Sequence, residues 1–356
     1  MNGQSAGIAL QRTHKIGIVG AGGIVKAAHL PAYRAAGFEV SAIYGRETHR
    51  ATTLAAEFGI PNVCHSLDEM LRDPSLEVID IAVPPEAQSQ ALRQAVTHGK
   101  HLLCQKPLAR TAAEAELLVE AAEAASVKLA VNVSMRWAPA MRETTDLIRQ
   151  GAIGDVTSAL FDVKYYENWD TWPWLPRSDR LLVLFDMIHI LNVTRTIVGQ
   201  PGSLQARYGR AQDSEVAGET WADIRLNYGN NVFVRFDEDS RIPSAQTCVR
   251  FQFNGSRGSI AGTLGVYYDY PLGRADTIKL VPSAVNESMI PGRKLPGRWA
   301  PDAFSKTMRA LFAAIENDSV PPNSGRDHLE TLRLIDSIYA AGRLEILPHK
   351  PGKDSR

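Results

Sequence analysis

The chain has 356 residues, of which 44% are hydrophobic and 22% charged, and its 39 basic and 39 acidic side chains give a formal net charge of zero. This length favours two domains, and the composition is typical of a soluble globular protein. The balanced charge argues against a nucleic-acid partner. The densest apolar stretch, residues 181–185, is too short to span a bilayer, and residues 1–13 lack the apolar core of a secretory signal. We therefore expect a cytoplasmic protein with no membrane segment.

Residues 15–132 alternate between short apolar runs and helical segments. Two capping boxes, Ser66 with Glu69 and Thr111 with Glu114, mark helix starts between the runs. Apolar runs separated by helices predict a parallel sheet with helices on both faces. We thus predict an α/β protein whose residues 1–134 form a doubly wound Rossmann domain, with strands at Lys15–Val19, Phe38–Ile43, Val78–Val83, His101–Cys104 and Lys128–Val131.

The pattern changes after Asn132. A helix is predicted over Pro139–Gln150, and most of 155–282 reads as strands joined by hairpin turns. Helices are expected over Leu184–Val198, Asp302–Glu316 and Arg326–Ala341. Residues 135–356 are therefore predicted to form an α+β domain for substrate binding and oligomerisation, built on a large, open and mainly antiparallel sheet. Because few helices cover its strands, a homodimer or homotetramer is expected to bury the remaining face. The strand candidates are Val156–Tyr165, Leu204–Tyr208, Thr220–Asn227, Val232–Asp237, Thr247–Asn254 and Ser259–Leu264.

A glycine-rich turn follows the first predicted strand. Gly20 permits a tight turn, and Gly22 lets the backbone approach a pyrophosphate at the start of a helix. The turn continues through Gly23 and Ile24, and Val25 departs from the small residue that the dinucleotide pattern prefers. The context of strand, turn and helix predicts an NAD or NADP site.

The second predicted strand ends in Tyr44, Gly45 and Arg46, where NAD-preferring sites usually carry an acid for the ribose hydroxyl. An acid would repel the 2′-phosphate of NADP, whereas Arg46 would attract it. One charge pair at 4 Å is worth about 4 kcal/mol at a surface-like dielectric, before desolvation. Arg46 therefore favours NADP, unless it is only a solvated residue at a helix start.

Lys106 follows the apolar run 102–104 directly, and Pro107 ends that strand. In an open parallel sheet ligands bind at the carboxyl ends of the strands. A lysine there can move protons or polarise a carbonyl, so Lys106 is a candidate catalytic residue.

Asp186 and His189 lie three residues apart on a predicted helix and share a face. An imidazole suits proton removal from an alcohol, and a neighbouring carboxylate could orient it. Taken alone, such a pair is more often structural.

Two further groups are candidates for contact with a substrate. Trp169, Trp172 and Trp174 lie within six residues, and flat aromatic faces suit a sugar or polyol ring, although tryptophans also anchor subunit interfaces. Asn132 ends the last strand of the first domain and Arg136 follows it; a hinge role is an equal alternative. The three isolated cysteines indicate free thiols, and no cluster of residues suggests a metal.

Together these residues resemble the Gfo/Idh/MocA oxidoreductases, the family of glucose-fructose oxidoreductase and inositol dehydrogenase. The likeness covers essentially the whole chain. Its motifs are Gly20–Ile24 with His29-Leu30-Pro31, Val83-Pro84-Pro85, Gly99-Lys100-His101, Gln105-Lys106-Pro107, Arg136–Pro139, Gly151–Gly154, His189 with Arg195 and Gly199, and Asn323–Asp327.

The resemblance implies hydride transfer between a nicotinamide and a sugar or cyclitol carbon, with the roles of the family's lysine and histidine falling on Lys106 and His189. It also implies that Pro84 and Gln105 lie at the cofactor. Three departures stand out. Gln105 replaces a glutamate, Gln88 stands where a histidine is frequent, and Phe185 takes the position of an aspartate that here comes one residue later, at Asp186.

We therefore expect an NAD(P)-dependent oxidoreductase acting on a small sugar, cyclitol or related hydroxy or keto compound. In oxidation, His189 would accept the hydroxyl proton and Lys106 would stabilise the developing oxyanion. Two alternatives stay open: a redox-neutral enzyme that retains its NAD, and a non-catalytic regulator that binds NAD(P) or a sugar.

Overall fold

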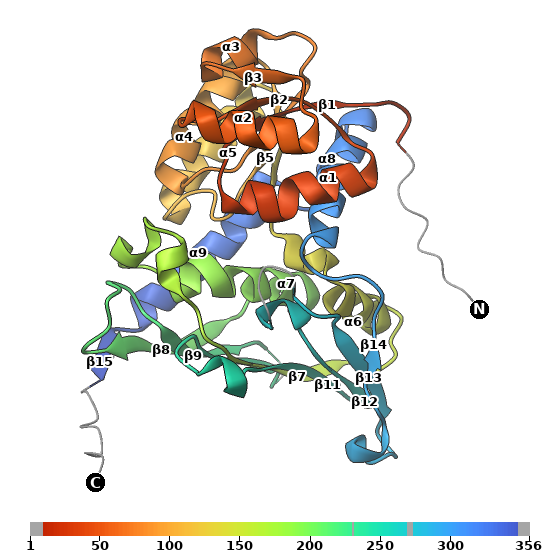
Figure 1. The fold of residues 1–356 in the computed structure, drawn as a ribbon. Coiled ribbons are helices and arrows are strands. Elements are labelled where there is room, and N and C mark those ends of the chain that lie inside the picture. Colours follow the sequence, from red (N-terminus) through yellow and green to blue (C-terminus); the bar gives the residue numbers. More distant parts are fainter. Residues whose placement is uncertain (1–9, 230, 269–272, 348–356) are drawn as a thin grey trace. The chain divides into compact units, whose positions relative to one another are not determined.

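Two β-sheets organise the computed structural model of the chain, which describes residues 10–229, 231–268 and 273–347 (Figure 1). Each sheet belongs to a separate compact unit. The first unit consists of the chain up to Trp137 together with Trp299–Arg333, and the second of Ala138–Arg298 and the residues from Leu334 onward.

The first unit contains a six-stranded parallel sheet in the order β3-β2-β1-β4-β5-β6. This is the strand order of a dinucleotide-binding Rossmann domain, so the predicted doubly wound fold is confirmed. The inner strands are almost wholly buried, as expected for apolar strands in a parallel sheet. The strands are β1 Lys15–Val19, β2 Glu39–Tyr44, β3 Asn62–Cys64, β4 Val78–Ile81, β5 His101–Cys104 and β6 Leu129–Val131.

Helices connect these strands, and both predicted capping boxes are present. The Ser66 hydroxyl accepts the Glu69 N–H at 3.0 Å, and the Thr111 hydroxyl accepts the Glu114 N–H at 3.2 Å. These contacts satisfy amide groups that a helix start leaves unpaired. The helical elements are the π-helix η1 Val25–His29, then α1 Leu30–Ala36, α2 Thr48–Phe58, α3 Leu67–Arg72, α4 Pro85–Thr97, α5 Ala112–Ala124 and the 3-10 turn η2 Ser134–Trp137.

The late segment Trp299–Arg333 belongs to the first unit, although we expected all of 135–356 in the second domain. It carries α8 (Asp302–Glu316) and the start of α9 (Gly325–Ala341). The Trp299 indole donates to the Ser134 hydroxyl at 2.9 Å, and Phe304 meets the His29 ring edge-on at 5.2 Å between centroids. Aromatic burial against the first unit explains why sequence order alone misplaced this segment.

The second unit is built on a nine-stranded sheet in the order β14-β13-β12-β11-β7-β10-β9-β8-β15. All neighbours pair antiparallel except β7 with β10 and β8 with β15, so the prediction of a mainly antiparallel sheet is confirmed. The strands are β7 Val156–Lys164, β8 Ser203–Ala211, β9 Trp221–Asn227, β10 Phe233–Asp239, β11 Cys248–Gly255, β12 Gly258–Thr263, β13 Thr277–Pro282, β14 Arg293–Lys294 and β15 Leu344–Leu347.

One face of this sheet is buried and the other is partly exposed. Phe161, Phe236, Phe251 and Phe253 are buried side chains on alternating positions, as one covered face requires. The covering helical elements are α6 (Pro139–Arg149), the π-helix η5 (Val183–Met187) and α7 (Ile188–Val198). The candidate pair Asp186 and His189 therefore lies on the elements over the buried face.

Candidate active site

The glycine turn after β1 provides an open backbone cradle. Gly20 has φ +126°, and a Cβ there would lie 2.4 Å from the Ala82 carbonyl oxygen, so only glycine fits. A Cβ at Gly22 would meet nothing within 4 Å, which leaves space in front of the turn. Gly23 and Ile24 begin the helical segment that η1 continues. This turn fits the pyrophosphate of a dinucleotide at a helix start.

The other predicted residues of the first unit gather at the same edge, because the carboxyl ends of parallel strands share one side of a sheet. β1 pairs with both β2 and β4, so the strand order reverses beside the glycine turn. The residues that follow these strands are Arg46 after β2, Pro84 after β4, Gln105 and Lys106 after β5, and Asn132 after β6.

Arg46 is exposed, and within residues 10–229, 231–268 and 273–347 no carboxylate forms an ion pair with it. The neighbouring Glu47 instead pairs with Arg50, with 3.1 Å between Oε2 and Nε. A guanidinium in this position can take a phosphate.

Gln105 links Lys106 to the buried side chain of His29. Its Oε1 accepts the Lys106 backbone N–H at 3.0 Å, and its Nε2 lies 2.7 Å from His29 Nε2. Because an amide nitrogen only donates, His29 Nε2 must accept, and the imidazole proton lies on Nδ1. That nitrogen is 2.6 Å from Asp80 Oδ2, which also accepts the Tyr33 hydroxyl at 2.7 Å.

Asn132 joins the same network. Its side chain is 1% exposed, and its Nδ2 lies 3.4 Å from His29 Nε2. Its Oδ1 has no hydrogen-bond partner within the described part of the chain. This buried oxygen lies at the end of a strand, and it fits as the acceptor for the carboxamide N–H of a nicotinamide. The sequence analysis did not identify Asp80 or Tyr33 as site residues. The signal that could have identified Asp80 was a carboxylate inside the apolar run 78–83.

Asp186 lies on the π-helix of the second unit and accepts two tyrosine hydroxyls. Tyr165 donates to Oδ2, and Tyr267 donates to Oδ1 at 3.0 Å. Both tyrosines have a pKa well above the usual range, because they are buried and because Asp186 lies beside them. The orientation of His189 by Asp186 stays a prediction. His189 itself is 7% exposed, at the start of α7.

Glu238 adds a second carboxyl next to Asp186. It lies on β10, is 1% exposed, and faces the buried side of the sheet. Burial, followed by the negative charge of Asp186, raises the pKa of Glu238 well above its usual range. The raised pKa means that Glu238 keeps its proton to higher pH than an exposed glutamate does. Sequence reasoning missed Glu238, although its alternation with Phe236 was a usable signal.

Another buried carboxylate, that of Glu219, holds the start of η5. The N–H groups of Leu181 and Val183 donate to Glu219 Oε1 at 3.1 and 3.0 Å, and the Tyr339 hydroxyl donates to the same oxygen at 2.5 Å. Burial raises the pKa of Glu219. These contacts fix where the helix that carries Asp186 begins.

The aromatic loop and Arg136 are placed as follows. Trp169, Trp172 and Trp174 are half-buried, and Trp174 meets Phe185 edge-on at 5.2 Å between centroids. Phe185, which takes the place of the family's aspartate, is therefore packed against the loop.

The Arg136 guanidinium donates to Asp327 at 2.6 Å and to the Pro322 carbonyl within the first unit. These contacts tie Arg136 to the late segment of the first unit, and its substrate role and its hinge role both stay predictions.

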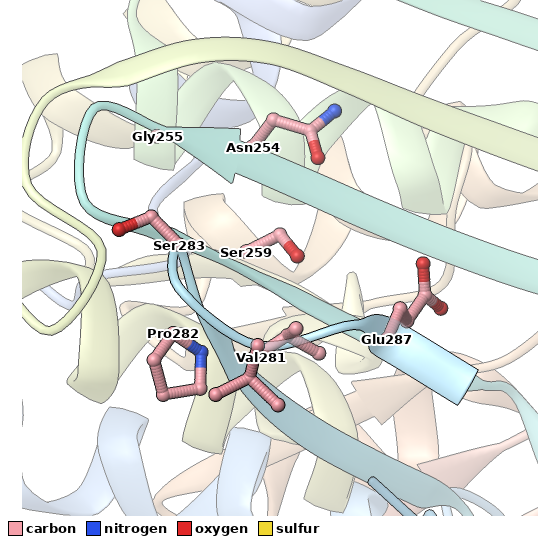
Figure 2. Close-up of a pocket in the computed structure, with 9 residues that line it drawn as sticks. Asn254, Gly255, Ser259, Val281, Pro282, Ser283 and Glu287 are labelled. Atoms are coloured by element: carbon pink, nitrogen blue, oxygen red, sulfur yellow. The ribbon is translucent and has the colours of Figure 1, made fainter. Parts of the chain in front are cut away.

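A shallow pocket of about 290 Å³ lies beside β12 and β13 of the second unit. Figure 2 shows Asn254, Ser259 and Glu287 around it. None of the candidate site residues lines it, and Glu287 is paired with Lys279 at 2.7 Å.

Across the described ranges, no group of three or more His, Cys, Asp or Glu side chains is arranged to hold a metal, and no helix combines the length and apolar character needed to cross a bilayer.

Comparison with known protein families gives two matches. Residues 14–133 match the model of an oxidoreductase family with an NAD-binding Rossmann fold, and residues 141–261 match the GFO/IDH/MocA C-terminal domain.

Curated proteins and a solved structure are also similar. A D-apiose dehydrogenase of Paraburkholderia graminis is 29% identical over 324 residues, covering 88% of this chain and 84% of that protein. A D-xylose 1-dehydrogenase (NADP(+)) of Haloferax volcanii is 25% identical, covering 91% and 95%. An oxidoreductase of Agrobacterium radiobacter, solved with NAD+, L-tartaric acid and magnesium, has a TM-score of 0.80 at 20% identity, covering 93% and 96%.

Proposed function

This chain belongs to the Gfo/Idh/MocA family of NAD(P)-dependent oxidoreductases, and on that premise we propose that it oxidises or reduces one carbon of a sugar, cyclitol or related polyol. The observation that carries the proposal is the convergence of the glycine turn and Lys106 on one edge of the first sheet. The bound nicotinamide supplies the hydride acceptor or donor. The named substrates of the similar dehydrogenases, apiose and xylose, place aldoses first among compounds to test.

In the direction of oxidation, His189 accepts the proton of the substrate hydroxyl, and the Lys106 ammonium stabilises the negative charge that develops on that oxygen. Asp186 contributes a carboxyl group that accepts two hydrogen bonds. Its two tyrosine donors hold it in one orientation, which supports a positioning role toward His189. The half-buried tryptophans of the loop supply flat faces for a polyol ring.

We also propose that NADP is preferred over NAD. The support is Arg46, an exposed guanidinium after β2, together with the absence of an acid at Gly45. A 2′-phosphate would find a cation there, and the carboxylate of the neighbouring Glu47 is paired with Arg50. The Haloferax relative that carries NADP(+) in its name agrees with this preference.

The experiment is a panel of aldoses, polyols and ketoses read at 340 nm with both cofactors. Lys106→Ala should lower kcat/KM by at least about a hundredfold, the scale of a lost acid–base or oxyanion group. Lys15→Ala, at the opposite end of the sheet, is the matched control. Near-normal turnover in the Lys106 variant contradicts the proposal. Substrate conversion on retained cofactor without net change at 340 nm would favour the redox-neutral alternative.

Association into a homo-oligomer through the second sheet is proposed as well. Leu160 and Phe233 lie on its partly exposed face, 38% and 46% exposed, and a second copy would bury them. Light scattering coupled to size exclusion tests this, with Phe233→Glu expected to weaken association.

A further inference from the structure

Gln88 is a fully buried amide that points at the segment carrying Lys106. It lies on α4 and is 0% exposed. Its Nε2 donates to the carbonyl oxygens of Gln105 at 2.8 Å, Pro107 at 3.0 Å and Leu108 at 3.3 Å. These carbonyls flank Lys106 on both sides. An NH2 group has two protons to share among them, whereas a neutral imidazole has one.

Gln105 also holds this segment, through its own side chain. Its carboxamide accepts the Lys106 N–H and donates to His29, whose proton is directed to Asp80. The amide cannot be turned over, because its oxygen must face the Lys106 N–H and its nitrogen must face the acceptor nitrogen of His29. Gln105 is therefore fixed at both ends.

From these contacts we propose that Gln88 and Gln105 form an amide clamp that positions Lys106. Both are positioning residues: they act through the backbone around Lys106 and not on the substrate. The clamp is neutral, because Gln105 carries no charge and His29 is held as the neutral Nδ1–H tautomer. The clamp therefore places no negative charge directly beside Lys106. This inference rests on the catalytic role proposed for Lys106.

The first experiment removes each arm of the clamp. Gln88→Leu and Gln105→Leu put a slightly shorter apolar side chain in place of each amide and remove the donors and the acceptor. We expect kcat to fall at least tenfold in each, while in Gln88→Leu the dissociation constant for the cofactor, titrated by fluorescence, changes less than threefold. Gln88→His should recover part of the loss, because it restores one donor. Gln90→Leu, an exposed glutamine on the same helix, is the control.

The second experiment changes charge at constant shape. Gln105→Glu places a carboxylate against His29 Nε2, which then has to donate. The 15N spectrum of histidine-labelled protein should show one neutral Nδ1–H imidazole in the wild type become an imidazolium. The basic limb of the kcat/KM profile should move to higher pH, because a carboxylate next to Lys106 favours its ammonium form.

The outcomes distinguish a failure of the amide clamp from a failure of the proposed function. If Lys106→Ala keeps its turnover, the proposed function fails and the clamp has no role to serve. If Lys106→Ala is inactive while both leucine variants match Gln90→Leu in kcat, the clamp is overturned and the function stands. An unchanged histidine spectrum in Gln105→Glu overturns the assignment of the His29 tautomer. If Gln88→Leu does not fold, Gln88→His and Gln105→Glu still decide the question.

Discussion

The proton on Glu238 makes a measurable contribution to how stability depends on pH. Burial raises the pKa of Glu238 above its ordinary value of 4.5, so the folded protein keeps a proton that the unfolded chain has already lost. Between 4.5 and the pKa in the folded state, the unfolded chain therefore binds fewer protons at this residue. The contribution of Glu238 to stability is complete below 4.5 and is lost as pH rises through that window.

Glu238→Gln removes this proton while keeping the shape of the side chain. For each pH unit by which the pH rises inside this window, the free energy of unfolding of the wild type should fall by about 1.4 kcal/mol. The variant should show no such fall at this residue. Relative to the wild type, the free energy of unfolding of the variant should thus rise by about 1.4 kcal/mol for each pH unit between 4.5 and the pKa of Glu238 in the folded protein. Contributions from groups that do not interact with Glu238, such as buried Glu219, are shared by both proteins and cancel in the difference.

Urea unfolding followed by tryptophan fluorescence at several pH values measures this difference. Glu215→Gln, at an exposed glutamate, controls for the substitution itself. Parallel pH profiles for wild type and Glu238→Gln would refute the reasoning. They would mean that Glu238 is ionised in the folded protein, so that two negative charges face each other at the candidate site.

Three further results are expected. Tyr267→Phe removes a hydroxyl that donates to the Asp186 carboxylate, so the free energy of unfolding should fall by about 1.5–3 kcal/mol in urea titrations; an unchanged value contradicts a charge-assisted bond. Asp186→Asn should move the acidic limb of the kcat/KM profile to lower pH, because protonated His189 loses a nearby negative charge; an unmoved limb means that Asp186 does not act on His189. Gly45→Asp should shift binding from NADPH toward NADH, with Gly45→Ala as control, since either Cβ lies 3.0 Å from that of Ala21; equal shifts in both variants would show a steric cause.

The first domain was predictable because its signals are local. Strands β1 and β5 begin and end where their apolar runs do, and both capping boxes form. The short β3, three residues of ordinary polarity, gave no such signal. The boundary between the two units could not be predicted from local sequence either. Trp299–Arg333 belongs to the first unit because its aromatic side chains pack against residues much earlier in the chain, as Phe304 does against His29.

The position of Lys106 at the carboxyl end of β5 was predictable from the sequence, and the surroundings of Asp186 were less so. A lysine directly after an apolar run can be recognised in the sequence alone, and so can a histidine three residues after an aspartate. The π-helical turn that carries Asp186 cannot be, because its wider hydrogen bonding is decided by packing. Its partners Tyr165, Tyr267 and Glu238 come from three distant segments, and only the sheet brings them together.

The discontinuous first unit restricts how relatives can exchange parts. Genetic recombination at residue 137 alone would join one protein's Rossmann segment to another's α8. His29 and Phe38 would then face foreign side chains in place of Phe304 and Phe312, whose rings lie 5.2 and 5.1 Å from theirs. A chimaera meant to transfer cofactor preference should therefore carry Trp299–Arg333 as well. Its last junction falls inside α9, where both parents must share a helical register.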